Sequence, residues 1–183
     1  DETIIVYGEP WDAGGSSLDS SIAASKDTLK SMPNVAIFND TIRDGIKGSV
    51  FEEIGIGFIQ GNKFMDSNVL AGILGGVKHD AIPSMDSFSL FPGQSINYVT
   101  AHDNNTLYDK LKLSTNDLSE FAIANMLKQA NAIVLTSQGT PFLHAGVDFM
   151  RSKPCIDGEC DATAYCQTAK FFKSRMFHCK YSL

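Results

Sequence analysis

Cysteine is missing from most of this 183-residue chain. All four cysteines lie beyond residue 150, so neither a disulfide framework nor a thiolate metal site can form within the first 150 residues. Among Cys155, Cys160, Cys166 and Cys179, only the first pair has a spacing found in zinc sites, and no pair of histidines completes such a site. The sequence therefore predicts no bound metal. The cysteines do not indicate whether the protein resides in an oxidising or a reducing compartment.

Long apolar runs and basic charge are also scarce. No stretch approaches the ~18 apolar residues of a membrane-spanning helix. The first 150 residues carry nine Lys and Arg against eighteen Asp and Glu, whereas nucleic acid requires a concentrated basic face. We therefore expect neither a membrane nor a nucleic acid as partner, and a neutral polar ligand is easier to accommodate. The length and the 43% of hydrophobic residues fit one globular domain with a sizeable core.

Four short apolar runs, at residues 4–7, 35–38, 96–100 and 132–136, are typical of strands buried on both faces. Polar residues follow each run. The carboxyl ends of parallel strands meet at one edge of a sheet, where a barrel gathers its catalytic loops. The pattern predicts an α/β fold whose strand ends form a site, with these residues after the four runs: Glu9; Asn39 and Asp40; His102, Asp103 and Asn104; Ser137 and Gln138.

Helical patterns lie between these runs. Asp117 and Glu120 have capping-box spacing, and the helical period that follows predicts a helix over 117–131. We also expect helices over 20–31 and 41–47. Residues 48–94 are rich in glycine and predict a long loop with one helix near 66–74. Gly55, Gly57 and Gly61 have the spacing of a phosphate loop, but no suitable strand precedes them, so we assign them to loop geometry.

Four strands are half of an eight-stranded barrel, which usually takes ~250 residues. Either the chain is half of a larger catalytic domain, or it forms a smaller open sheet. The chain begins at Asp1 and enters a strand almost at once, so we expect it to be cut from a longer protein.

Four sequence motifs, which occur in a fixed order, favour half of a larger catalytic domain over a smaller open sheet. Together they resemble the type I pullulanases, starch-debranching members of the alpha-amylase superfamily of glycoside hydrolases, from about residue 3 to Lys153. The resemblance implies a partial (β/α)8 barrel, with strands five to eight and their helices in residues 1–153. The motifs are Tyr7-Gly8-Glu9-Pro10-Trp11; Phe38-Asn39-Asp40 with residues 43–48 (Arg-Asp-Gly-Ile-Lys-Gly); residues 97–104 (Asn-Tyr-Val-Thr-Ala-His-Asp-Asn); and residues 138–146 (Gln-Gly-Thr-Pro-Phe-Leu-His-Ala-Gly).

Glu9 is the general acid/base that the resemblance implies. A glycosidic oxygen leaves poorly unless it is protonated as the bond breaks, so a carboxylic acid must lie beside it. Trp11 could supply an apolar wall and a face on which a sugar stacks. The alternative is a surface glutamate held extended by the following proline.

Asp103 resembles the family's third carboxylate, which grips sugar hydroxyls and stabilises the oxocarbenium-like transition state, with His102 as its partner. The alternative is that residues 102–104 cap a following helix. A further segment of the family, assigned here to substrate binding, is matched by Asn39, Asp40 and Arg43. A structural ion pair between Arg43 and Asp44 would explain the arginine equally well. We expect Gln138 and His144 to be scaffold hydrogen bonders.

The family's nucleophilic aspartate lies in an Arg-x-Asp segment on the fourth barrel strand, and no such segment precedes Glu9. Retaining hydrolysis needs both carboxylates, so we expect the chain alone to be inactive. After Lys153 the sequence leaves the family pattern, and residues 151–183 reverse the charge balance with six Lys and Arg against three Asp and Glu. We therefore treat residues 154–183 as a divergent tail, disordered or frame-disrupted.

The expected substrate is an α-glucan with α-1,6 branches, such as pullulan, glycogen or starch. Three alternatives stay open: an isoamylase-like or branching activity, a noncatalytic glucan-binding half-barrel, and a chain that does not fold stably because its sheet edges are open. No cofactor is expected. Calcium is compatible with an intact enzyme of this family, but no ligands for it can be identified here. The sequence supports both a cytoplasmic and a secreted location.

Overall fold

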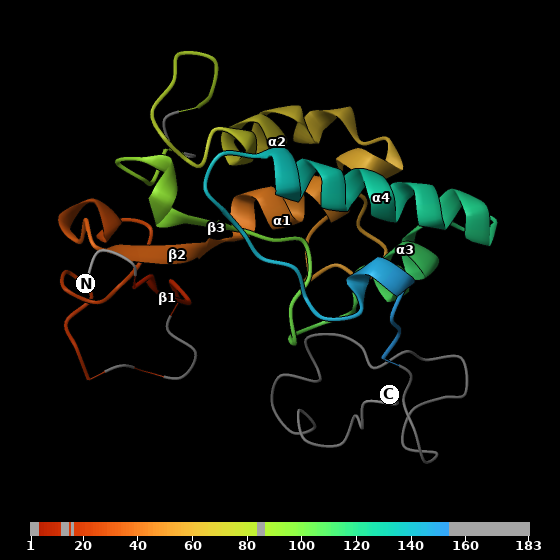
Figure 1. Ribbon diagram of the computed structural model, residues 1–183, viewed down its shortest axis with the longest axis horizontal. Helices are drawn as coiled ribbons and strands as arrows, with labels where there is room; N and C mark the ends of the chain where they lie inside the picture. Colours follow the sequence, from red (N-terminus) through yellow and green to blue (C-terminus); the bar gives the residue numbers. More distant parts are fainter. Residues whose placement is uncertain (1–3, 12–14, 16, 84–86, 154–183) are drawn as a thin grey trace.

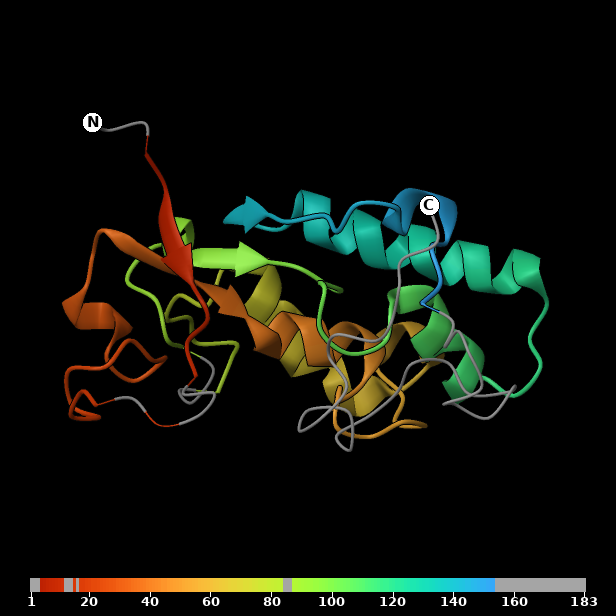
Figure 2. The same cartoon turned by 90° about the horizontal axis from the view of Figure 1, so that it is seen from below.

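Helical structure follows each strand of a parallel sheet. The computed structural model describes residues 4–11, 15, 17–83 and 87–153. Within them the sheet has four strands in the order β1 (Val6–Gly8), β2 (Val35–Asn39), β3 (Ser95–Asn97) and β4 (Thr140–Pro141), and every neighbouring pair is parallel (Figures 1 and 2). The α/β prediction is confirmed, and three of the four predicted strands overlap observed ones.

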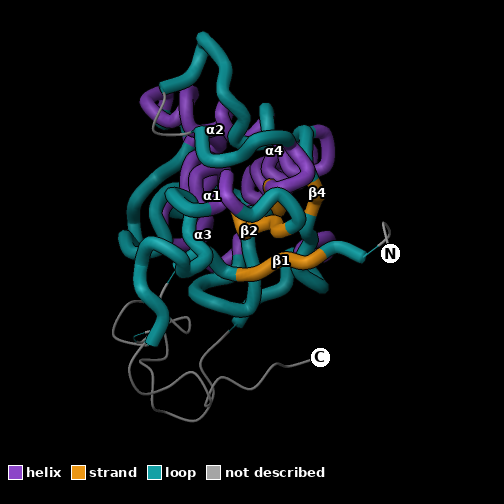
Figure 3. Tube along the Cα trace, turned by 90° about the vertical axis from the view of Figure 1, so that its left-hand side faces the viewer, coloured by secondary structure: helices purple, strands orange, loops and turns teal. Residues whose placement is uncertain are grey.

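The α-helices lie together on one side of the strands (Figure 3). They are α1 (Asp40–Lys47), α2 (Asp66–Ile73), α3 (Leu107–Ser114) and α4 (Glu120–Thr136), with short 3-10 turns at Leu29–Ser31, Phe58–Gln60, Lys63–Met65, Pro92–Gln94 and Val147–Phe149. The described helices include none with the length and apolar character needed to cross a membrane.

The main core packs between these helices. Aliphatic side chains from all four helices meet there and are almost fully buried, because each helix turns its apolar face toward the others. Gly72 of α2 lies directly against Ile42 of α1, and a Cβ on Gly72 would overlap the isoleucine side chain. The cluster consists of Ile42, Ile46, Ile59, Val69, Val99, Leu107, Leu111, Ile123, Leu127, Ala130, Val134 and Val147.

The predicted strand at 132–136 is wrong, because these residues form the last turns of α4. Ile123, Leu127, Ala130 and Val134 are buried at helical spacing, so the apolar run continues the helical period and does not start a strand. The strand comes later, at β4, and has only two residues. The helix also begins later than predicted: Ser119 caps it through a bond from the Ala122 amide (3.3 Å).

The predicted helix over 20–31 is wrong as well, because only Leu29–Ser31 is helical and forms a 3-10 turn. Short polar side chains hydrogen-bond the local backbone in its place. Thr28 Oγ1 donates to the Ala23 carbonyl (2.5 Å) and accepts from the Ser25 amide (3.0 Å), which fixes a turn there. The expected helices near 41–47 and 66–74 are confirmed as α1 and α2.

Candidate functional site

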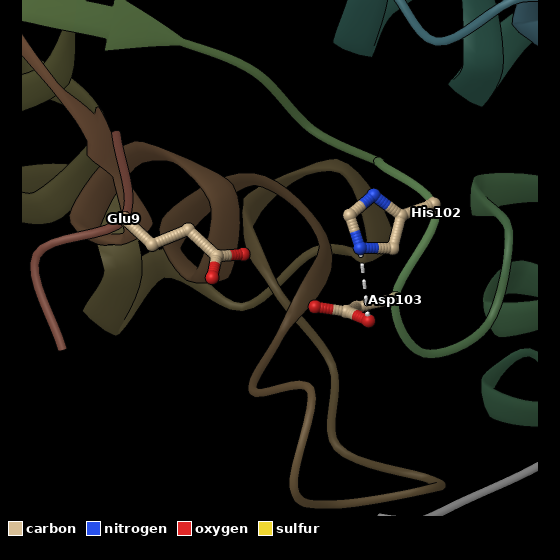
Figure 4. Close-up of side chains that lie close together, drawn as sticks. All are labelled: Glu9, His102 and Asp103. Atoms are coloured by element: carbon tan, nitrogen blue, oxygen red, sulfur yellow. Dashed lines mark ion pairs between the residues drawn. The ribbon is translucent and has the colours of Figure 1, made fainter. Parts of the chain in front are cut away.

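Two loops that follow strands bring three polar side chains together. Glu9 comes directly after β1, and His102 and Asp103 lie in the loop between β3 and α3. One ligand atom from each of the three lies within 4.8 Å of the others (Figure 4). The structure thus brings together three of the residues that the sequence placed at the carboxyl ends of the strands, although Glu9 and Asp103 are 94 positions apart.

The cluster is open to solvent. Glu9 and His102 are exposed, whereas the Asp103 side chain is 28% exposed. His102 Nε2 lies 3.3 Å from an Asp103 carboxylate oxygen, a contact that orients both groups side by side (Figure 4). An exposed pair of this kind contributes little to stability. Its polar atoms are thus available to a ligand that approaches from the solvent.

A row of aromatic rings crosses the sheet. Tyr7, Phe38, Tyr98 and Phe142 come from the four strands or the residues just after them, and neighbouring rings pack edge to face with centroids 5.0 to 6.5 Å apart. Side chains alternate along a strand, so Glu9 continues on the face that carries Tyr7. The row therefore begins two residues before Glu9 along the chain, and its edge-to-face contacts link all four strands.

Trp11 lies two residues beyond Glu9 and is 38% exposed. The buried Pro10 between them holds the chain extended, because proline restricts the residue before it. The indole ring is partly open to solvent, two residues along the chain from Glu9. Its predicted role in substrate binding stays a prediction.

Asn39 was predicted to bind substrate, but its amide is fully buried and bonded within the protein. Its Oδ1 accepts from the Ile42 amide (3.2 Å) and caps α1, and its Nδ2 donates to Ser95 Oγ (3.0 Å) and Asn97 Oδ1 (3.3 Å). Asn97 Nδ2 in turn donates to the Gln138 carbonyl (2.7 Å). These bonds join β2, β3 and the approach to β4, so Asn39 shapes the edge of the sheet on which the site stands.

Arg43 and Asp40 lie at the start of α1 and already have partners. The Arg43 guanidinium donates two bonds to the Asp44 carboxylate (2.6 and 2.9 Å) and one to Tyr98 Oη (2.8 Å). Burial alone would lower the pKa of Arg43, but the bonds to Asp44 and the neighbouring negative charges raise it above its ordinary value. Asp40 forms an ion pair with Lys26. The structural ion pair considered as the alternative for Arg43 is thus present.

His144 and Gln138 support the loop after β4. His144 shares a hydrogen bond with Arg151 (Nε2 to Nη1, 2.9 Å), and burial together with the charge of Arg151 lowers the pKa of His144 to about 4. The imidazole is therefore neutral near pH 7 and accepts from the guanidinium. Gln138 acts through its backbone, since its amide donates to the Ile73 carbonyl (2.8 Å). Both residues fit the expected scaffold role.

The groups that hold the Asp103 loop were not among the predicted site residues. Lys153 Nζ donates to the carbonyls of His102 (2.5 Å) and Asn104 (2.7 Å). The fully buried Asp109 accepts from Ser152 Oγ (2.5 Å) and from the Lys153 amide (2.7 Å). Spacing along the chain carried no signal for these contacts, because residues 152 and 153 are more than 40 positions from their partners.

An acid, an imidazole and a second carboxylate can together hold the hydroxyls of one sugar ring and protonate an oxygen next to it. The same groups include ligand types that a divalent cation accepts. Nothing else among the described residues distinguishes a metal site, and the prediction that no cofactor is bound stays a prediction. The cysteine tail, 154–183, lies outside the described residues.

Comparison with known proteins identifies relatives of the chain. No family model matches it. The pullulanase of Bacillus subtilis (strain 168) is 34% identical over 154 residues, which cover 84% of this chain and 21% of the relative. Pullulanase A of Streptococcus pneumoniae serotype 2 is 32% identical over 161 residues, or 84% and 12% of the two chains. The crystal structure of the Paenibacillus barengoltzii pullulanase in complex with maltohexaose and alpha-cyclodextrin superposes with a TM-score of 0.77 at 41% identity, covering 84% of this chain and 23% of that one.

The chain is thus similar to pullulanases over most of its length, and it shares the fold of the solved structure over the matched part. It spans about one fifth or less of the length of these curated relatives.

Proposed function

We propose that this chain supplies the general acid/base and the hydroxyl-binding residues of an α-glucan site. It would form the C-terminal half of a pullulanase-type catalytic barrel. The observation that carries the proposal is the convergence of Glu9, His102 and Asp103 within 4.8 Å at the carboxyl ends of β1 and β3. The relative from Paenibacillus barengoltzii was crystallised with maltohexaose, a glucan that fits a site of this kind.

The half-barrel is supported by the state of strand β1. Its residues Val6 and Tyr7 are 56% and 49% exposed, and Ile4 and Ile5 just before it are 69% and 58% exposed. β1 pairs only with β2 among the described strands, so one of its edges is open. An exposed apolar edge is a ready partner for another strand. A fourth barrel strand beside β1 would cover it and bring the nucleophile segment next to Glu9.

In the assembled site, Glu9 would donate a proton to the glycosidic oxygen as the bond to the anomeric carbon breaks. His102 and Asp103 would hold the hydroxyls of the same ring, with bonds that strengthen as positive charge develops on it. A nucleophilic carboxylate would form the glycosyl intermediate, and Glu9, now ionised, would activate the water that releases it. The bonds expected to be cleaved are the α-1,6 branches of pullulan, glycogen or starch, with retention.

The nucleophile segment is not part of these 183 residues, so the purified chain should bind glucan without cleaving it. We would incubate it with pullulan and measure reducing ends, with Glu9→Gln as the matched control. The expected result is no release above that of the control. Release that the Glu9→Gln change abolishes would show that the chain is active alone, and comparison of the products from pullulan and glycogen would then separate debranching from branching activity.

A further inference from the structure

Asp103 lies in a loop that contains neither helix nor strand. Residues 101–105 lie outside any helix or strand, and Asn104 adopts a left-handed backbone conformation (φ 60°), which costs free energy for a residue other than glycine. Such a loop keeps one shape only when its surroundings impose it. The position of the Asp103 carboxylate therefore depends on contacts from outside the loop.

Lys153 makes these contacts. Its ammonium donates to the carbonyls of His102 (2.5 Å) and Asn104 (2.7 Å), the two residues on either side of Asp103. Both carbonyls must turn inward to the same nitrogen, which fixes the peptide units that carry Asp103 between them. Lys153 is only 7% exposed, and this burial lowers its pKa, while the nearby carboxylates of Asp103 and Asp109 oppose that shift.

Lys153 is itself held in place by Asp109 of helix α3. Asp109 is fully buried in the first turn of α3 and accepts from Thr106 Oγ1 (2.8 Å), Ser152 Oγ (2.5 Å) and the Lys153 amide (2.7 Å). Thr106 also caps α3, since its Oγ1 accepts from the Asp109 amide (3.2 Å). The backbone of Lys153 is thus anchored to the first turn of α3, the helix that directly follows the Asp103 loop.

We infer that Lys153 is a positioning residue for the glucan site, and that it holds Asp103 and His102 in place by bridging the carbonyls on either side of Asp103. The inference rests on the proposed function for the nature of the ligand, but not for the bridge itself. Lys153 bonds to the loop backbone and acts through Asp103. It does not need to touch the sugar.

The chain contains a matched control. Lys110 is 2% exposed, and its ammonium donates in the same way to backbone carbonyls of another loop, those of Ser49 (3.1 Å), Glu52 and Glu53 (3.2 Å). Lys110→Met therefore removes an equivalent buried bridge without touching the Asp103 loop. Comparing it with Lys153→Met separates loss of stability from loss of the site.

We would measure amide hydrogen exchange, melting temperature and maltotetraose affinity for both variants of the purified chain. We expect exchange at residues 102–105 to become about tenfold faster or more in Lys153→Met alone, and maltotetraose affinity to fall by about tenfold, while Lys110→Met with a similar loss of melting temperature keeps its affinity. Unchanged exchange at 102–105 in Lys153→Met, or equal acceleration in both variants, would overturn the inference.

Two further arms keep the outcomes distinct. If the unmodified chain does not bind maltotetraose, the proposed function fails, while the exchange data still decide the bridge. If Lys153→Met does not fold, scalar couplings across the hydrogen bonds can be measured by NMR in the unmodified chain. Couplings from Lys153 Nζ to the carbonyl carbons of His102 and Asn104 are expected, and their absence from a resolved Lys153 ammonium signal would contradict the bridge.

Discussion

Replacing Asn39 with alanine separates a structural role from a ligand-binding one. Loss of the helix cap on the Ile42 amide costs about 1 kcal/mol, and the buried groups of Ser95 and Asn97 that lose a partner add about 1–3 kcal/mol. We therefore expect the free energy of unfolding to fall by about 3 kcal/mol. For a chain of this length, that lowers the melting temperature by about 6–12 °C.

The assay is thermal unfolding followed by circular dichroism, with urea unfolding as a second measure. Asn34→Ala is the matched control, because Asn34 lies just before the same strand but is exposed, so its melting temperature should stay close to that of the unmodified chain. If Asn39→Ala melts with the control while maltotetraose affinity is lost, the structural account of Asn39 is refuted and its predicted substrate contact is supported.

Two other predictions concern pH and packing. The pKa of His144 is about 4 in the fold and near 6.5 in an unfolded chain, so the unfolded state binds more protons as pH falls below 6.5 and the fold loses stability there. The melting-temperature difference between the unmodified chain and His144→Gln should therefore shrink from pH 7 to pH 4.5, and a constant difference would rule this out. Gly72→Ala should lower the melting temperature although alanine favours helices, because the new methyl group overlaps Ile42. Gly8→Ala, where a Cβ meets nothing within 4 Å, is the control, and equal effects in the two variants would show that the contact relaxes freely.

The sequence predicted the parts of the fold that local pattern determines. The run at 35–38 became β2 and the polar start at Asp40 became α1, because apolar continuity and a capping asparagine act over a few residues. The run at 132–136 misled, since four apolar residues in a row suit a strand or a buried helix equally well. Only the burial of Leu127 and Val134 on one helix face decides between them, and that depends on tertiary packing.

The candidate site also combines features that the sequence indicates with features that depend on tertiary packing. Glu9 and Asp103 could be selected because each follows a strand-like run, and parallel strands bring such ends together. The burial of Asn39 and the bridge from Lys153 could not be foreseen, because they depend on contacts with residues more than 40 positions away in the sequence. The candidate chemistry was therefore visible in the sequence, whereas its support was visible only in the structure.

The claim that Glu9, His102 and Asp103 form one glucan site is tested most directly by an NMR titration of the isotopically labelled chain with maltotetraose. We expect the largest shift changes on the amides of these three residues and on the Trp11 indole. Asp103→Asn should weaken binding about tenfold or more, while a change of the exposed Asp148 after β4, Asp148→Asn, should leave it unchanged. Shift changes that map to another face of the molecule, or binding that Asp103→Asn does not affect, would contradict it.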